Sequence, residues 1–264
     1  IAAETVSQTL HGYEKNNLYL FLRSKFGPED ALRLMKDYRV GTSKHWPGSC
    51  VFWQTDIKGC VRTGKVMLYN AENGKRVKEP FNHVTWVHSL LKLPEFNLRQ
   101  CFFGEHLLPM NRGKPVAIVE SEKTALVSAY YLPEYVWLAT GGKNGCVNAD
   151  ALRVLRSCQV ILYPDIGATD QWRQKLSLLR NLGIEASIFN FLEDVATDDE
   201  RTAGLDIADY LLQIEPDQAI LQSMIRRNPM LQKLIDELQL TLVSVERYNP
   251  DTDTIHKPSK SDKS

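Results

Sequence analysis

Short apolar runs alternate with segments of helical spacing between residues 115 and 191. The run Val116–Val119 is continuous, which is the pattern of a parallel strand that is buried on both faces. Further runs cover residues 135–139, 159–163 and 186–191, and helical patterns lie between them, after Ser121 and in 150–156 and 170–182. This alternation predicts an α/β fold with a parallel sheet and flanking helices.

The part of the chain before this alternation mixes helical and β patterns. Residues 16–40 carry two short helical patterns that are broken at Gly27–Pro28. Three β-rich runs follow, at 49–54, at 60–69 and from Lys75, and the turn residues between them predict a β meander. We therefore expect an N-terminal α+β lobe over residues 1–112 and the parallel-sheet domain over residues 113–213.

The C-terminal part has a different composition. Residues 207–240 return to helical spacing, and we expect a helical segment at 214–248. From Asn249 the chain is rich in Pro, Ser, Asp and Lys, which predicts a disordered tail at 249–264. No apolar run reaches the roughly 20 residues of a membrane-spanning helix, so no membrane is expected as a partner.

The five cysteines are widely spaced and form no C-x-x-C pair. This spacing argues against a zinc site within the sequence and against a disulfide framework. We expect free thiols in a reducing, cytoplasmic setting.

Charge is distributed unevenly along the chain, although 32 Lys+Arg balance 32 Asp+Glu. Residues 1–114 hold 17 basic and 10 acidic side chains, and the remaining residues hold 15 and 22. The most positive stretch, 58–78, has six basic residues and one acidic residue. A solvated β face would have the same pattern, but the scarcity of acids favours nucleic-acid contact. The candidate nucleic-acid-binding residues are Arg62, Lys65, Lys75, Arg76 and Lys78.

Acidic residues follow two of the predicted parallel strands. Glu120 follows the first apolar run and Asp165 follows the third, at the ends of strands where ligands collect in open parallel sheets. The loop after the second run contains Gly141, Gly142 and Lys143, which makes it a candidate phosphate-binding loop. The sequence has no G-x-x-x-x-G-K-[ST] motif and no G-x-G-x-x-G motif after a strand, which argues against a P-loop and a dinucleotide site.

At these positions the sequence resembles the Toprim domain of bacterial-type DNA primases, topoisomerases and some nucleases. Residues 120–126 are similar to the E-G-E-K-D-A-L form of plasmid and phage primases, and Asp165 falls on the first Asp of the family's Asp-x-Asp pair. Residues 204–211 are similar to the G-x-D-x-N-D-Y-L stretch of the same primases. Residues 16–106 resemble the basic N-terminal half of a primase core, most of all in primase-like proteins of bacterial mobile genetic elements.

The resemblance implies a nucleotidyltransferase that makes primers on single-stranded DNA from nucleoside triphosphates. It implies Mg²⁺ or Mn²⁺ as cofactor, replication of a mobile element as context, and a helicase as a candidate partner. Glu120 and Asp165 would then be metal ligands or catalytic groups, and Lys123 or Lys143 would offset charge on the leaving group. Gly167 stands where the family has its second Asp, which weakens the site. The candidate carboxylates that would complete it are Asp170, Asp206 and Asp209.

Simpler interpretations stay open beside these. Glu120 has the position of an ordinary strand-end carboxylate, and Asp206 is equally suited to cap a helix that begins near Ile207. At the level of function, the alternative is a non-catalytic nucleic-acid-binding module whose metal site has degenerated at Gly167. A Toprim nuclease is a third hypothesis, and it is disfavoured because the N-terminal half resembles a primase.

Overall fold

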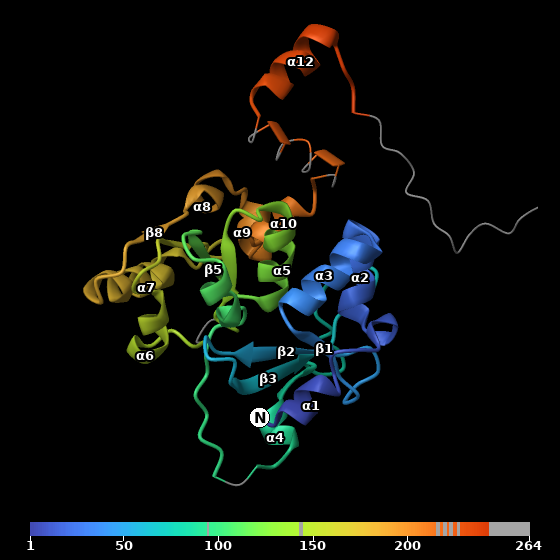
Figure 1. The fold of residues 1–264 in the computed structure, drawn as a ribbon, viewed down its shortest axis with the longest axis vertical. Helices are drawn as coiled ribbons and strands as arrows, with labels where there is room; N and C mark the ends of the chain where they lie inside the picture. Colours follow the sequence, from blue (N-terminus) through green and yellow to red (C-terminus); the bar gives the residue numbers. More distant parts are fainter. Residues whose placement is uncertain are drawn as a thin grey trace, which may run out of the picture. The chain divides into compact units, whose positions relative to one another are not determined.

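The computed structural model describes residues 1–93, 95–142, 145–214, 217–218, 221, 224–225 and 228–242. The chain forms two compact units, Ile1–Pro216 and Asp217–Ser264. The first unit contains an antiparallel and a parallel sheet, each of four strands, together with their helices (Figure 1). Both lobes expected from the sequence lie within this unit.

Short helices begin the first unit. Asn16 caps α2 (Asn17–Phe26) because its side-chain oxygen accepts hydrogen bonds from two backbone N–H groups of the first turn. α3 (Pro28–Asp37) follows directly, with proline in its first position, so the predicted break at Gly27–Pro28 is confirmed. The other helical elements before the parallel sheet are α1 (Ala3–Ser7), η1 (Tyr13–Lys15), α4 (Val87–Leu90) and η2 (Glu105–Met110).

The antiparallel sheet has the strand order β1-β2-β3-β4. The runs predicted at 49–54 and 60–69 are confirmed as its two central strands. The strand predicted from Lys75 is wrong, since Arg76 forms only an isolated bridge with Tyr69 and the segment soon reaches Pro80, which cannot donate a ladder hydrogen bond. The strands are β1 (Val40–Thr42), β2 (Cys50–Thr55), β3 (Val61–Met67) and β4 (Val84–Trp86).

The parallel sheet has the strand order β6-β5-β7-β8. All three of its strand pairs are parallel, and helices connect the strands, so the predicted α/β architecture is confirmed. The strands are β5 (Val116–Val119), β6 (Val136–Ala139), β7 (Val160–Leu162) and β8 (Ala186–Ile188). The connecting helices are α5 (Glu122–Tyr131), α6 (Ala149–Leu152) with η3 (Arg153–Leu155), and α7 (Thr169–Asn181).

Buried contacts join the two sheets within the first unit. Phe103 pairs with Ala139 of β6 in an isolated antiparallel bridge, and its ring packs against Tyr38 and Phe52, each with a centroid distance of 5.4 Å. The hydroxyl of Tyr38 also donates a hydrogen bond to the carbonyl oxygen of Trp137, at 3.1 Å. The edge of the parallel sheet is therefore fixed against the N-terminal elements by both backbone and aromatic contacts.

Short helices follow the parallel sheet in the chain: α8 (Phe191–Val195), α9 (Asp198–Ala203) and α10 (Ile207–Leu211). In the second unit, α12 (Met230–Leu238) is described, and none of its residues is buried. The tail expected at 249–264 lies outside the described residues, as does part of the helical segment expected at 214–248. No helix of the described residues is long and apolar enough to cross a membrane.

Candidate active site

Two carboxylates, those of Glu120 and Asp165, follow the ends of β5 and β7, and we call this edge of the parallel sheet the carboxyl edge. The two strands are parallel neighbours, with Ile118 opposite Leu162. Glu120 and Asp165, which follow these strands, therefore lie at the same edge of the sheet. Among the described residues, neither carboxylate accepts a hydrogen bond or takes part in an ion pair. Both groups are therefore available to a ligand.

The environment of Asp165 disfavours its charged form. Burial raises the pKa of its carboxyl group to about 8, and the negative charges of Asp206 and Glu120 add to this effect. The positive charge of Lys175 opposes it. The protonated form of Asp165 is thus favoured at neutral pH, and a cation that bound here would displace that proton.

The other predicted acidic ligands have structural roles. The side chain of Asp206 accepts hydrogen bonds from two N–H groups at the start of α10 and from the hydroxyl of Thr124. The carboxylate of Asp209 accepts from the backbone N–H of Asp206 and completes a capping box. Asp170 is exposed and paired with Arg173 on the surface of α7. The capping interpretation of Asp206 is confirmed.

Gly167 lies in the loop between β7 and α7. Its φ of 82° is in the left-handed region, which an aspartate would adopt only with strain. Its N–H donates a hydrogen bond to the carboxylate of Glu193, at 2.7 Å, and Glu193 also pairs with Arg201. The conformation of this loop therefore favours glycine at position 167, and the carboxylate of Glu193 fixes the loop backbone.

The glycine loop after β6 supports Glu120 through the backbone. The N–H groups of Gly141 and Gly142 both donate to the carbonyl oxygen of Glu120, each at 3.1 Å. The hydroxyl of Thr140 donates to the carbonyl oxygen of Gly142, at 3.0 Å. These bonds fix the backbone from which the Glu120 side chain extends. Lys143, predicted to bind phosphate with these glycines, lies outside the described residues.

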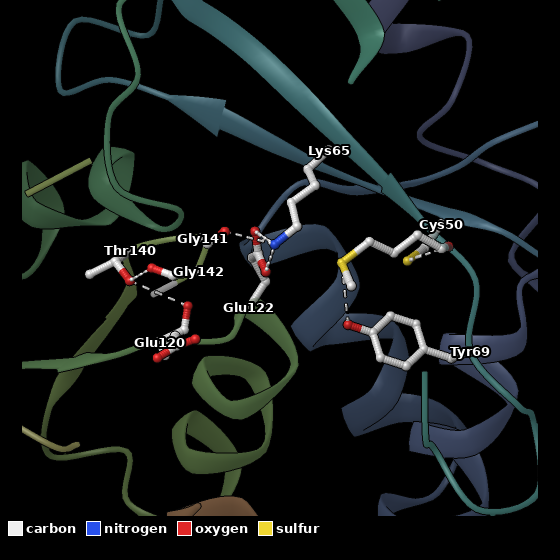
Figure 2. Close-up of polar contacts among 9 residues, drawn as sticks. Cys50, Lys65, Tyr69, Glu120, Glu122, Thr140, Gly141 and Gly142 are labelled. Atoms are coloured by element: carbon white, nitrogen blue, oxygen red, sulfur yellow. Dashed lines mark hydrogen bonds and ion pairs between the residues drawn. The ribbon is translucent and has the colours of Figure 1, made fainter. Parts of the chain in front are cut away.

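Lys65 of β3 connects the antiparallel sheet to this loop. Its Nζ lies 3.0 and 2.9 Å from the two carboxylate oxygens of Glu122, and it donates to the carbonyl oxygen of Gly141, at 2.9 Å (Figure 2). The side chains of Lys65 and Glu122 are only 9% and 2% exposed. Lys65 is therefore not part of an exposed cationic surface, contrary to its expected place among the nucleic-acid-binding residues.

The other predicted nucleic-acid-binding residues fall into two groups. Arg62 is partly buried and forms an ion pair with Asp56, at 2.5 Å. Lys75, Arg76 and Lys78 are exposed, and within the described part of the chain none of them has an ion-pair partner. Three free cations thus remain of the five, and we call them the basic segment.

Two basic residues flank the acidic groups. Lys123, predicted to be catalytic, lies in the first turn of α5, where its charge lowers the pKa of Asp206 against the raising effect of burial. Lys175 of α7 was not expected at the site. The signal in the sequence is a lysine three residues after Trp172, on a helix face that otherwise carries Leu176 and Leu179.

A cavity of about 660 Å³ lies beside the loop that follows β6. Lys58, Arg62 and Arg99 line it together with Glu105, which is 2% exposed. Burial raises the pKa of Glu105 to about 7, although backbone N–H groups of Phe102 and Ile57 donate to its carboxylate. This carboxyl group was missed in the sequence because its burial depends on contacts between distant segments.

The fit of a divalent cation follows from these placements. Among the residues that the structure describes, no group of three or more His, Cys, Asp or Glu side chains is arranged to hold one ion. Mg²⁺ in phosphate-transfer sites is commonly held by one or two carboxylates together with phosphate oxygens and water. Glu120 and Asp165 therefore fit a cation that binds together with a phosphate-bearing ligand.

Solved structures of a bacterial primase domain have a similar fold. The RNA polymerase domain of the primase DnaG from Mycobacterium tuberculosis is similar, with a TM-score of 0.50, 11% identity, and 82% of this chain and 79% of that chain covered. The crystal structure of the same domain in complex with the double-stranded DNA GACCGGAAGTGG has a TM-score of 0.52 and 12% identity, with 85% and 78% covered. The fold of the chain is thus similar to that of a primase RNA polymerase domain.

The family of the chain follows from its sequence. The domain of unknown function DUF6371 matches residues 16–166, more than half of the chain. The chain belongs to this family. No curated protein matches the sequence.

We predict that Lys65→Met lowers the free energy of unfolding by about 3–5 kcal/mol, because it leaves Glu122 as a buried charge without its partner. Urea unfolding followed by circular dichroism measures this change. Arg33→Met removes one partner of the exposed pair with Asp30 and should cost less than about 1 kcal/mol. Equal effects of the two substitutions would contradict the role of the buried pair.

The raised pKa of Glu105 predicts that stability falls as pH rises from its ordinary value of 4.5 to about 7. In that window the folded state keeps a proton that the unfolded chain has released. Glu105→Gln should reduce the fall in unfolding free energy by up to about 3 kcal/mol. The exposed Glu29→Gln is the control. Identical pH profiles for wild type and Glu105→Gln would refute the assignment.

Proposed function

We propose that this chain is the catalytic core of a primase-type nucleotidyltransferase with a Toprim-like site. The proposal rests above all on two carboxylates without partners among the described residues, Glu120 and Asp165, at the carboxyl edge of the parallel sheet. The primase-type fold and the motifs around these residues support it. Template-directed primer synthesis from nucleoside triphosphates is the activity that this combination fits best.

In this proposal Asp165 would hold Mg²⁺ or Mn²⁺, with Glu120 as the second ligand or as the general base. The bound ion would supply Lewis-acid stabilisation of the charge that develops on the phosphoryl oxygens. As general base, Glu120 would accept the proton of the attacking hydroxyl group. Lys123 is retained as a candidate partner of the leaving pyrophosphate, and the Gly141–Gly142 backbone keeps Glu120 in place.

The proposed template is single-stranded DNA, bound by the basic segment of Lys75, Arg76 and Lys78. Their exposure and their lack of ion pairs with described residues support this, as does the double-stranded DNA in complex with the mycobacterial domain of similar fold. A helicase as partner and a mobile genetic element as context are further parts of the proposal. They rest on the resemblance of residues 15–215 to primase-like proteins of such elements.

A second candidate is a nucleic-acid-binding module without catalysis. Gly167 favours it, because the residue supplies no carboxylate and its loop conformation suits glycine. The two candidate functions can be distinguished by experiment, because only the first makes a primer, and its synthesis requires Asp165.

We predict that the chain makes primers on a single-stranded template with Mn²⁺ and nucleoside triphosphates. Asp165→Asn should lower the rate by about 100-fold or more, which is the usual effect of removing one group that stabilises the transition state. Glu120→Gln should act in the same direction. Asp170→Asn is the matched control, because Asp170 is exposed and paired with Arg173.

Equal product from wild type and Asp165→Asn would exclude this site as the place of synthesis. No product from wild type, under conditions in which it binds DNA, would favour the non-catalytic module.

We predict a weak salt dependence for binding of single-stranded DNA. Three phosphate contacts by the basic segment give a slope of log K against log salt of about −2, at about −0.7 for each contact. Replacing Lys75, Arg76 and Lys78 by Glu should abolish this slope and weaken binding to every sequence alike. Arg33→Glu is the control, since Arg33 is already paired with Asp30. Unchanged affinity in the triple variant would reject this surface.

A further inference from the structure

The turn between β1 and β2 and the connection between β3 and β4 lie at the same end of the antiparallel sheet. Cys50, the first residue of β2, pairs with Met67, the last residue of β3. Met67 also pairs with Val84, the first residue of β4. Residues 43–49 and 68–83 therefore both leave the sheet at this end, and the basic segment belongs to the second of these connections.

Backbone hydrogen bonds fix the loop that contains Phe81. The N–H of Val77 donates to the carbonyl oxygen of Leu68, at 3.0 Å, directly after β3. The N–H of His83 donates in turn to the carbonyl oxygen of Val77, at 3.2 Å. The residues between Val77 and His83 thus form a short loop with both ends fixed, and Lys78 and Phe81 are exposed residues of this loop.

Phe81 belongs to a cluster of rings. It stacks on the ring of His83, with a centroid distance of 4.2 Å and an interplanar angle of 23°. Trp46, from the β1–β2 turn, lies 6.2 Å from Phe81 and 5.1 Å from His83, measured between ring centroids. His83 is only 9% exposed and Trp46 is partly buried, whereas Phe81 is 53% exposed. The protein therefore supports one face of the Phe81 ring and leaves more than half of the residue exposed.

The packing of the loop does not account for this exposed ring. Apolar surface in contact with water is unfavourable. His83 and Trp46 already pack against each other, and backbone hydrogen bonds fix the ends of the loop, so neither depends on the exposed part of Phe81. A ligand that covered the exposed part of the ring would remove the unfavourable contact with water.

The charges of the two connections indicate the chemistry of that ligand. They carry the three cations of the basic segment and Lys44, against the two acidic residues Glu72 and Glu79. Nucleic acids offer phosphates to such cations and flat bases to an exposed aromatic ring. The faces of the bases are covered by their neighbours in a duplex, whereas a single strand exposes them.

We infer that Phe81 is a stacking site for an unpaired base of single-stranded DNA, beside the phosphates that the basic segment binds. This inference rests on the proposed function and adds to it a contact that requires unpaired bases. It makes this end of the antiparallel sheet selective for single strands over duplex DNA.

Two strands that differ only in their bases test the inference. One is an oligothymidylate of about 12 nucleotides, and the other has the same backbone with abasic sites in place of the bases. Fluorescence anisotropy measures the affinity of the full chain for each strand at one salt concentration. Wild type should bind the oligothymidylate about tenfold more tightly than the abasic strand, because a base stacked on an aromatic ring contributes about this much.

Phe81→Ala should lower the affinity for the oligothymidylate by about tenfold and leave the affinity for the abasic strand and the salt dependence unchanged. Phe81→Trp keeps an aromatic face and should retain the wild-type preference. Phe191→Ala is the matched control, because Phe191 of α8 is similarly exposed, at 57%.

Equal affinity of wild type and Phe81→Ala for the oligothymidylate would overturn the inference and leave an apolar protein surface as the alternative partner of the ring. An equal loss of affinity for both strands would overturn it as well, because the abasic strand has no base to stack.

The primer-synthesis assay separates this inference from the proposed function. If wild type makes no primer but binds the oligothymidylate through Phe81 as expected, the proposed catalysis fails and the base contact stands. If wild type makes primers and Phe81→Ala binds both strands as wild type does, the base contact fails alone. If wild type does not bind the oligothymidylate, the base contact fails too.

Discussion

The buried contact of Lys65 with Glu122 and Gly141 is the interaction on which the candidate site depends. It joins a strand of the antiparallel sheet to the first turn of α5 and to the loop after β6. Burying two charges is costly unless each is paired and hydrogen-bonded, and here the ammonium group of Lys65 meets three oxygen atoms. The loop that it holds donates two N–H groups to the backbone of Glu120. The N-terminal sheet thereby positions a residue of the parallel sheet.

The acidic residues near the carboxyl edge have two different roles: some cap a helix, and others are available to a ligand. Asp206 and Asp209 use their oxygen atoms at the start of α10 and on Thr124, while Glu120 and Asp165 have no such partners among the described residues. Asp206 and Asp209 still affect the site, because their negative charges raise the pKa of Asp165. A site with two free carboxylates in the described part of the chain is suited to a cation and a phosphate-bearing ligand that bind together.

The periodicity of the sequence was sufficient to predict the parallel sheet and the positions of Glu120 and Asp165, because a short apolar run both defines a strand and marks its end. It was not sufficient for Lys65, since a lysine in a charge-rich stretch has the pattern of a solvated face and its burial depends on Glu122, 57 residues away. The sequence shows Lys175 as a lysine on an apolar face of a predicted helix. Its electrostatic interaction with Glu120 and Asp165 depends on how that helix packs in the fold. One edge strand of the antiparallel sheet, β4, is three residues long and too short for a periodicity signal.

Anomalous diffraction from a crystal grown with Mn²⁺ and a non-hydrolysable nucleoside triphosphate tests the central claim most directly. We expect one manganese peak within coordination distance of the carboxylates of Glu120 and Asp165, with the triphosphate bound at the same edge of the parallel sheet. Asp206 and Asp209 should keep their hydrogen bonds at the start of α10. A manganese ion bound by Asp206 and Asp209 instead, or a triphosphate bound away from the carboxyl edge, would contradict the account.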